Sequence, residues 1–261
     1  LVAALREKRP LFGGIVGYDD TVIPQIENAV LSGQDIIFLG ERGQAKTRLA
    51  RLLTELLDPA IPAIAGCELS DDPFAPICAA CRYRVANDGD AVEVHWVARD
   101  QRYTEKLATP DIAIADLIGE VDPIKVAEGR YLSDELTIHY GLLPRTQRGI
   151  FALNELPDLA ERVQVGLLNV MEERDVQIRG YKVRLPLDLF VVASANPEDY
   201  TNRGRIITPL KDRFGSQIRT HYPREIAIEI GIMEQERSSY ADEGITTTVP
   251  AYMKELLAEL S

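Results

Sequence analysis

A run of small, polar and basic residues follows a short apolar segment at Ile36 to Leu39, which is suited to a buried strand. The run is Gly40-Glu41-Arg42-Gly43-Gln44-Ala45-Lys46-Thr47. It fits the spacing G-x-x-x-x-G-K-[ST] of a Walker A phosphate loop, except that Ala45 stands in place of the second glycine. In such a loop, backbone N–H groups and a helix N-terminus bind polyphosphate, Lys46 contacts the β- and γ-phosphates, and Thr47 ligates Mg²⁺. An ordinary strand-to-helix turn is the alternative, and alanine fits at position 45 only if its φ stays negative.

A second apolar run ends in two polar residues. Its sequence is Ile150-Phe151-Ala152-Leu153-Asn154-Glu155. A Walker B strand usually ends in Asp-Glu, where the aspartate holds Mg²⁺ and the glutamate polarises the attacking water. Asn154 can accept a hydrogen bond from a Mg²⁺-bound water but brings no charge, which predicts weaker Mg²⁺ coupling and slow turnover. Glu155 keeps the position of a general base, and a plain strand ending at a solvated turn is the alternative.

Two further polar positions follow core-like segments. Asn196 comes directly after the apolar run Leu189 to Ala193 and Ser194-Ala195. A polar residue at the carboxyl end of a core strand points into the ligand crevice of an open α/β sheet, so Asn196 can orient water or contact the γ-phosphate. A turn-capping asparagine before Pro197 is the alternative. Arg213 follows Asp212, and such a pair is usually a surface ion pair.

Three cysteines and one histidine lie between residues 58 and 104, a range that reads as an insertion. They are Cys67, Cys78, Cys81 and His95. A C-x2-C pair with a third cysteine and a histidine can make a tetrahedral zinc site, although one pair with irregular partners more often gives free, partly buried thiols.

The elements that would position these residues show helical and strand periodicity. After Thr47, leucines recur at helical spacing, at positions 49, 52, 53, 56 and 57. A helix is predicted over 161–173, with Val163, Leu167, Val170 and Met171 on its inner face. A hairpin is predicted around 175–186, and a half-exposed strand is predicted at 92–96. A helix is predicted beyond residue 224, although residues 226–232 also alternate like a strand.

Composition describes an ordinary globular protein. The chain has 261 residues, 46% apolar and 27% charged, with a formal net charge of −12. This acidic balance argues against a dedicated nucleic-acid binder. We expect no membrane span, because no apolar run approaches 18 residues, and no signal peptide. Three cysteines suit a reducing cytoplasm. The start at Leu1 and the helix-like end at Ser261 are expected of a fragment.

Taken together, residues 15 to 225 resemble the AAA+ ATPase core of the MoxR and magnesium-chelatase ATPase-subunit group. Besides residues 40–47, the motifs that carry the resemblance are Asp-Leu-Ile-Gly-Glu-Val-Asp (116–122), Gly-Leu-Leu-Pro-x4-Gly-Ile-Phe-Ala-Leu-Asn-Glu (141–155), Ala-Asn-Pro-Glu (195–198) and Pro-Leu-Lys-Asp-Arg-Phe-Gly (209–215). The resemblance implies a five-stranded parallel sheet between helices and a helix-2 insert around 119–146.

The resemblance also implies roles for individual residues. Asn196 becomes the sensor-1 residue, Val16 and Gly17 lie near adenine, and Arg213 enters the neighbouring site of a hexameric ring as an arginine finger. Arg203 and Arg205 are competing candidates for contacts in trans. The cysteine-bearing insertion is similar to one seen in chelatase-type members.

The predicted organisation is an AAA+ P-loop α/β domain over 1–224 and the beginning of a helical lid over 225–261, truncated and without a convincing sensor-2 arginine. The predicted function is a cytoplasmic ATPase that uses ATP and Mg²⁺ to remodel a partner or drive metal insertion, with a von Willebrand factor A-type partner. A nucleotide-binding scaffold with impaired hydrolysis is the alternative. A transcriptional activator or helicase of the same superfamily is a third interpretation, against which the chain lacks a Gly-Ala-Phe-Thr-Gly-Ala loop.

Overall fold

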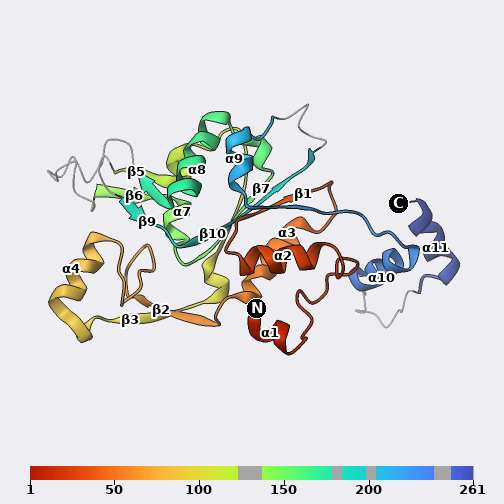
Figure 1. Ribbon diagram of the computed structural model, residues 1–261, viewed down its shortest axis with the longest axis horizontal. Coiled ribbons are helices and arrows are strands. Elements are labelled where there is room, and N and C mark those ends of the chain that lie inside the picture. Colours follow the sequence, from red (N-terminus) through yellow and green to blue (C-terminus); the bar gives the residue numbers. More distant parts are fainter. Residues whose placement is uncertain (123–136, 178–183, 198–203, 238–247, 261) are drawn as a thin grey trace.

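The central feature of the computed structural model is a five-stranded sheet in which every strand is parallel to its neighbours (Figure 1). The structure describes residues 1–122, 137–177, 184–197, 204–237 and 248–260. In spatial order the strands are β11 (Ser216–Arg219), β1 (Ile36–Leu39), β10 (Leu189–Ala195), β7 (Gly149–Asn154) and β4 (Tyr103–Leu107). The predicted five-stranded parallel sheet is therefore confirmed.

Continuous apolar runs form the inner strands because both faces of the sheet are covered. Successive side chains of β1 point to opposite faces: Ile36 and Phe38 join one core cluster, while Ile37 and Leu39 join the other. The cluster containing Phe38 packs under α2 (Val22–Leu31) and α3 (Lys46–Leu52). The sheet thus lies between two helical layers.

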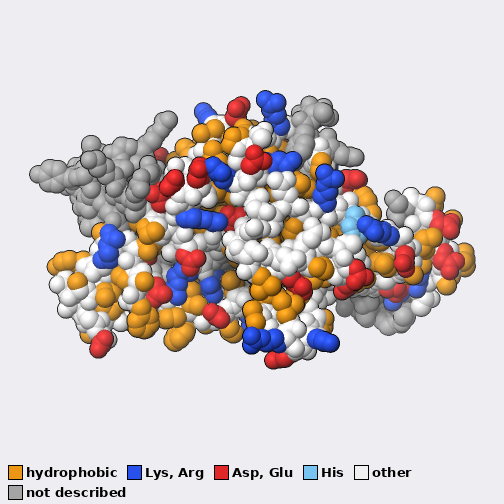
Figure 2. All heavy atoms as spheres, viewed as in Figure 1, with side chains coloured by type: hydrophobic (Ala, Val, Ile, Leu, Met, Phe, Trp, Pro, Cys, Tyr) orange, Lys and Arg blue, Asp and Glu red, His pale blue; other side chains and the backbone are white. Residues whose placement is uncertain are grey.

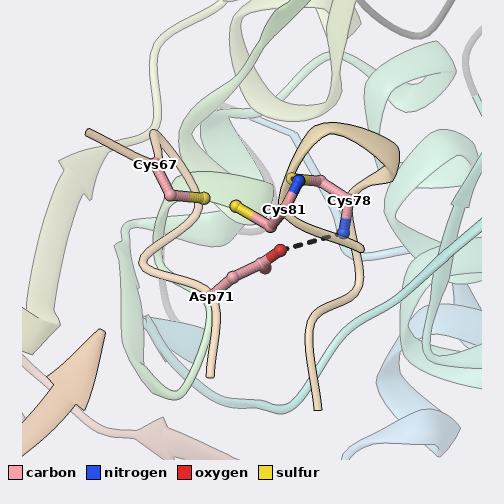
Figure 3. Close-up of side chains that lie close together, drawn as sticks. All are labelled: Cys67, Asp71, Cys78 and Cys81. Carbon is pink, nitrogen blue, oxygen red and sulfur yellow. Dashed lines mark hydrogen bonds between the residues drawn. The ribbon is translucent and has the colours of Figure 1, made fainter. Parts of the chain in front are cut away.

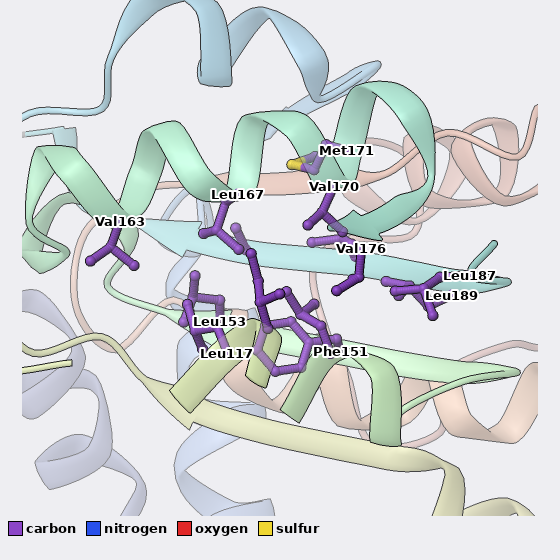
Figure 4. Close-up of a cluster of buried hydrophobic side chains, with 14 of the residues drawn as sticks. Leu117, Phe151, Leu153, Val163, Leu167, Val170, Met171, Val176, Leu187 and Leu189 are labelled. Carbon is purple, nitrogen blue, oxygen red and sulfur yellow. The ribbon is translucent and has the colours of Figure 1, made fainter. Parts of the chain in front are cut away.

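The second cluster lies on the opposite face, beneath α8 (Glu161–Glu173), α5 (Ile114–Ile118), α7 (Leu142–Arg145) and α9 (Thr208–Arg213). Figure 4 shows α8 above the strands, with Leu167 and Val170 directed towards Phe151. Residues 163, 167, 170 and 171 are buried as the helical periodicity predicts, and the helix has the predicted bounds.

Three antiparallel strand pairs lie outside the central sheet. They are β2 (Ala60–Ile64) with β3 (Val94–Ala98), β5 (Gly119–Val121) with β6 (Ile138–Tyr140), and β8 (Asp175–Gln177) with β9 (Arg184–Pro186). The last pair forms the arms of the predicted hairpin, whose turn at 178–183 lies outside the described residues. The part of the predicted helix-2 insert at 123–136 lies outside them too.

The remaining elements are short. They are α1 (Val2–Arg6), η1 (Leu53–Leu56), α4 (Ala79–Asp88), η2 (Gly89–Ala91), η3 (Arg99–Arg102), η5 (Leu156–Asp158), α10 (Ile226–Glu236) and α11 (Ala251–Leu260). The ambiguous segment at 226–233 is helical. The leucine pattern after residue 47 does not continue as one α-helix, because the chain tightens into η1 after Leu52. In the described part of the chain, no helix is long and apolar enough to cross a membrane.

The region that carries the cysteines lies apart from the central sheet. It comprises β2, α4 and β3, at the lower left of Figure 1, and the chain then enters β4 at Tyr103, inside the range predicted as an insertion. The predicted strand at 92–96 corresponds to β3, in which Val94 and Trp96 are 44% and 67% exposed while Val97 is buried. Hydrophobic side chains gather over this edge in Figure 2.

Candidate functional site

The glycine-containing loop connects β1 to α3, where the sequence predicts a phosphate loop. Ala45 has φ 55° and ψ 17°, a left-handed conformation, and Gly43 has φ 79°. The prediction that alanine fits at position 45 only with a negative φ is therefore wrong. The alanine Cβ is accommodated in this left-handed conformation at a cost of about 1 kcal/mol.

Gln44 ties this loop to the last strand of the sheet. Its Oε1 accepts hydrogen bonds from the Glu41 backbone N–H at 3.1 Å and the Thr220 hydroxyl at 2.7 Å, and its carbonyl accepts one from the Tyr18 hydroxyl at 3.0 Å. A Cβ on Gly40 would come within 2.0 Å of Thr220 Oγ1 and 2.2 Å of Gln44 Oε1. Glycine at position 40 is thus required by the packing of the loop, and β1 leads into a fixed loop.

Lys46 and Thr47 occupy the first turn of α3. Lys46 is buried, and its ammonium donates to the Gly40 carbonyl at 2.7 Å and to the Glu41 carbonyl at 2.5 Å. Thr47 is half-buried beside it. The ammonium is therefore held at the loop, close to the backbone that would surround a phosphate chain.

Two hollows flank the loop. One, of about 420 Å³, is lined by Gly40, Glu41, Gln44, Pro197, Lys211 and Arg219, among others. Neither Lys211 nor Arg219 was predicted from the sequence as a site residue. Arg219 lies beside Leu39 because β11 pairs with β1 in that register, and a single sequence carries no signal of that pairing. The hollow has room and positive charge for phosphate groups.

The second hollow, of about 280 Å³, lies on the other side of the loop. Its lining includes Val16, Gly17, Gly43 and Ala45, and the α10 residue Ile232. The two residues that the resemblance implies near adenine are thus next to the loop. The hydroxyl of Tyr222, another lining residue, donates a hydrogen bond to the backbone carbonyl of Arg42 at 2.9 Å.

The polar end of β7 lies against its two neighbouring strands. Asn154 donates from Nδ2 to Glu105 Oε1 on β4 at 2.8 Å, and its Oδ1 accepts from the Ser194 hydroxyl on β10 at 3.3 Å. Glu155 follows with φ 55°, and its N–H donates to Ser194 Oγ at 3.2 Å. Asn154 is thus bound on both sides, and Glu155 leaves the strand in a left-handed turn.

Glu105 is a carboxylate on β4 beside this strand end, and it was not predicted from the sequence as a site residue. Arg51, one turn after Thr47 on α3, donates to it through Nε at 2.7 Å and Nη2 at 3.1 Å. These hydrogen bonds lower the pKa of Glu105, and burial raises the pKa of neighbouring Tyr103. In the β4–β7 register Glu105 pairs with Ala152, two residues before Asn154, and its side chain reaches the Asn154 amide. The charge absent from the Walker B position therefore lies one strand away, bound to Arg51.

The remaining predicted residues lie in different environments. Asn196 is buried just beyond β10, next to Pro197, which lines the larger hollow. Arg213 is exposed at the end of α9, where it pairs with Glu172 of α8 at 2.6 Å. Arg205 is also exposed, and Arg203 lies outside the described residues. The structure therefore brings Asn196 towards the loop and directs Arg213 away from it, towards solvent.

The three cysteines come together, but the fourth member of the group is Asp71 instead of His95. His95 is exposed on β3 and is not brought to the thiols. Hydrogen bonding with Cys78 lowers the pKa of the Cys67 thiol to about 6. Figure 3 shows the Cys67 and Cys81 sulfurs facing each other above the Asp71 carboxylate.

The residues around the loop fit a magnesium-bound nucleotide. The two hollows on either side of the loop offer space for a nucleotide, and the loop already binds the Lys46 ammonium. Thr47 and Asn154 offer oxygen donors of the hard type that Mg²⁺ prefers, both neutral. Glu155 is the acid that directly follows Asn154, just beyond the end of β7.

Solved structures with a similar fold include the following three. A chain in a model of the complex between subunits BchI and BchD of magnesium chelatase is 23% identical, with a TM-score of 0.61, covering 90% of this chain and 70% of that one. A protein of Cytophaga hutchinsonii described as a candidate ATPase is 17% identical, with a TM-score of 0.54, covering 99% and 62%. NtrX from Brucella abortus is 13% identical, with a TM-score of 0.53, covering 98% and 49%.

A family profile, the Sigma-54 interaction domain, matches residues 127–213. Comparison with curated proteins finds no match. The matched segment is a minor part of the chain and includes Asn154, Glu155, Asn196 and Arg213. Together with the strand order of the central sheet, these likenesses identify the fold as that of the AAA+ P-loop ATPases.

Proposed function

We propose that this chain binds ATP with Mg²⁺ and hydrolyses it slowly, as one subunit of a ring that remodels a partner or drives metal insertion. The observation that carries the proposal is the loop between β1 and α3. This loop binds the Lys46 ammonium through the Gly40 and Glu41 carbonyls and is flanked by two hollows. It lies at the carboxyl end of the sheet, where Glu155 and Asn196 follow neighbouring strands.

Binding would use groups that the fold already orients. The N–H groups of the loop and the first turn of α3 favour anions. The Lys46 ammonium would exchange the Gly40 and Glu41 carbonyls for phosphate oxygens, which bind a cation more strongly. Mg²⁺, held by Thr47 and through water by Asn154, would neutralise charge on the phosphates.

Hydrolysis would use Glu155 and Asn196. Glu155 would accept the proton of the attacking water, and Asn196 would orient that water. Because Asn154 is neutral and Glu105 is bound to Arg51, less negative charge faces the metal than in an Asp-Glu site. This is the physical basis for slow turnover, and it also supports the second candidate, a nucleotide-binding scaffold.

Arg213 supports assembly into a ring. It lies at an exposed helix end and is bound only by an exposed carboxylate, Glu172, among the interactions of the described residues. An ion pair of this kind contributes little to stability. Arg213 would readily exchange it for a phosphate of the nucleotide bound by a neighbouring subunit. The similarity to a chain from the BchI–BchD complex supports a partner protein, for which a von Willebrand factor A-type protein is our proposal.

The Sigma-54 profile match favours a third candidate, a transcriptional activator. The matched segment carries the polar strand end, the residue after β10 and Arg213, which any AAA+ ATPase needs. The net charge of −12 and the missing Gly-Ala-Phe-Thr-Gly-Ala sequence weigh against it. Salt-sensitive binding to duplex DNA would favour this candidate over ours.

The test is ATP turnover by the full-length protein and by Glu155→Gln and Arg213→Ala, with Arg162→Ala, an exposed arginine of α8, as the matched control. We expect a wild-type rate above background that both variants lose and the control keeps. Mixing Arg213→Ala with Lys46→Ala should restore part of the rate, because each subunit supplies what the other lacks across an interface. Background rates in all proteins, with ATP still bound, would favour the scaffold instead.

A further inference from the structure

Four side chains with metal-binding atoms meet in the region between β2 and α4. They are Cys67, Asp71, Cys78 and Cys81, and their donor atoms all lie within 4.8 Å of one another. Cys67 and Asp71 come from the loop after β2, whereas Cys78 and Cys81 begin α4. The group is nearly closed to solvent, since only Cys67 is more than slightly exposed.

Asp71 is oriented as a ligand with one oxygen to spare. It is 1% exposed, and its Oδ2 accepts the backbone N–H groups of Ile77 and Cys78 at 3.1 and 3.0 Å. Its Oδ1 is buried and has no hydrogen-bond partner. Leaving a buried carboxylate oxygen unpaired costs about 1–3 kcal/mol. A bound cation would satisfy this oxygen, and backbone donors to the other oxygen are the usual support of a ligating carboxylate.

The C-x2-C segment has the local geometry of a metal knuckle. Cys78 is the N-cap of α4, and its sulfur accepts the backbone N–H of Cys81 at 3.3 Å. This hydrogen bond holds the Cys78 sulfur at the first turn of α4, and the Cys81 sulfur lies within 4.8 Å of it. The positive end of the α4 dipole therefore faces the sulfurs, and Arg84 lines the adjoining hollow of about 200 Å³. Both favour a group of thiolates.

We propose that Cys67, Asp71, Cys78 and Cys81 bind one Zn²⁺ ion in a tetrahedral S3O site. Donors at about 2.3 Å from a tetrahedral ion lie about 3.8 Å apart, so the four groups need to close by at most about 1 Å. An iron–sulfur cluster distributes its cysteines over several irons and needs wider spacing. Thiolates with one carboxylate suit zinc better than magnesium or calcium, which prefer oxygen.

The site is structural, because all four positions are filled by protein and none is left for water. It joins the loop after β2 to α4, and Cys78, Cys81 and the neighbouring Leu69 are part of the core cluster beneath α8. The metal would thus hold the loop after β2 and the start of α4 in the arrangement that packs into this core. The proposal is independent of the proposed ATPase function.

The first experiment measures the metal content of the full chain, expressed with zinc supplementation and purified under reducing conditions. We expect about one zinc per chain. Replacement by Co²⁺ should give thiolate-to-cobalt charge-transfer absorption and the strong visible bands of a tetrahedral ion. No zinc in supplemented protein would overturn the proposal, as would iron with inorganic sulfide. A disulfide that persists with excess zinc under reducing conditions would overturn it too.

The second experiment compares variants. Cys67→Ser and Cys81→Ser should lose zinc, and Asp71→Asn should bind it at least tenfold more weakly in competition with a chelator, although its amide oxygen still accepts both N–H groups. His95→Ala is the matched control and should keep full zinc content. Zinc lost by His95→Ala, or kept unchanged by Asp71→Asn, would overturn this donor set.

A thermal melt separates metal loss from misfolding. Zinc should raise the Tm of metal-free wild-type protein, and each ligand variant should melt near the metal-free wild type whether or not zinc is added. A variant that still gains the full wild-type shift would contradict the assignment of that ligand.

Discussion

Replacing Asn154 by aspartate would restore the usual Walker B acid, and the structure predicts that this change alone is harmful. The Asn154 amide donates to the Glu105 carboxylate at 2.8 Å. The Asn154→Asp change removes this donor and sets two carboxylates against each other. Two unit charges at about 4 Å repel by about 4 kcal/mol at an effective dielectric of about 20. Because Arg51 and solvent screen the pair, we expect about 1–3 kcal/mol of lost stability.

The assay is a double-mutant cycle. Urea unfolding and Mg-dependent ATP turnover would be measured for wild type, Asn154→Asp, Glu105→Gln and the double variant. In the double variant the glutamine amide can donate to the new carboxylate, so we expect stability to return to within about 1 kcal/mol of wild type. We also expect turnover to rise above wild type only in the double variant, where the introduced charge is free of repulsion.

The pH dependence provides a second check. Repulsion raises the pKa of the paired carboxyls in Asn154→Asp, and a raised folded-state pKa gives a stability deficit that grows as pH rises through it. The deficit should therefore shrink at about pH 4, where one carboxyl is protonated. Asn87→Asp, on the exposed face of α4, controls for added charge alone. A single variant as stable as wild type at pH 7, and faster than the double variant, would refute this reasoning.

Three further predictions follow from single positions. Ala45→Gly should raise the free energy of unfolding by up to about 1 kcal/mol, because φ is 55° there, whereas Ala50→Gly inside α3 should lower it by about 1 kcal/mol in the same urea experiment. Gly40→Ala should abolish binding of a fluorescent ATP analogue, because its Cβ would overlap side-chain atoms within 2.2 Å. Burial raises the pKa of Asp35 above 3.8 despite its ion pair with Arg174. The free energy of unfolding of wild type relative to Asp35→Asn should therefore fall as pH rises from 3.8 through that raised pKa. A difference in unfolding free energy that does not change with pH would contradict the buried charge.

Local patterns were sufficient for much of the fold. The buried strand before the loop, the helix at 161–173 with its inner face, and the arms of the hairpin near 175–186 follow from apolar runs and periodicity. These three features depend on residues close in sequence, which a single chain displays directly. The five-stranded parallel sheet was expected only from the resemblance to the AAA+ core.

Local patterns failed where the outcome depends on a neighbouring strand or on backbone conformation. The left-handed φ of Ala45 is imposed by the turn into α3, and alanine gives no sign of it. His95 has the chemistry of a zinc ligand, but β3 carries it to the surface. Asp71 has no motif of its own and joins the thiols because the loop after β2 folds back onto α4.

The sequence itself determined three groups of candidate residues, because each group is recognised from the spacing of residue types within one segment. They are the loop from Gly40 to Thr47, the polar strand ends at Asn154, Glu155 and Asn196, and the three cysteines. Only the tertiary structure decided which groups face them. Strand register brings Glu105 to Asn154 and Arg219 to the loop, and burial leaves one oxygen of Asp71 without a partner among the thiols. Contacts between residues far apart in the chain are set by the packing of whole elements, and the charge and ligand sets of both sites depend on those contacts.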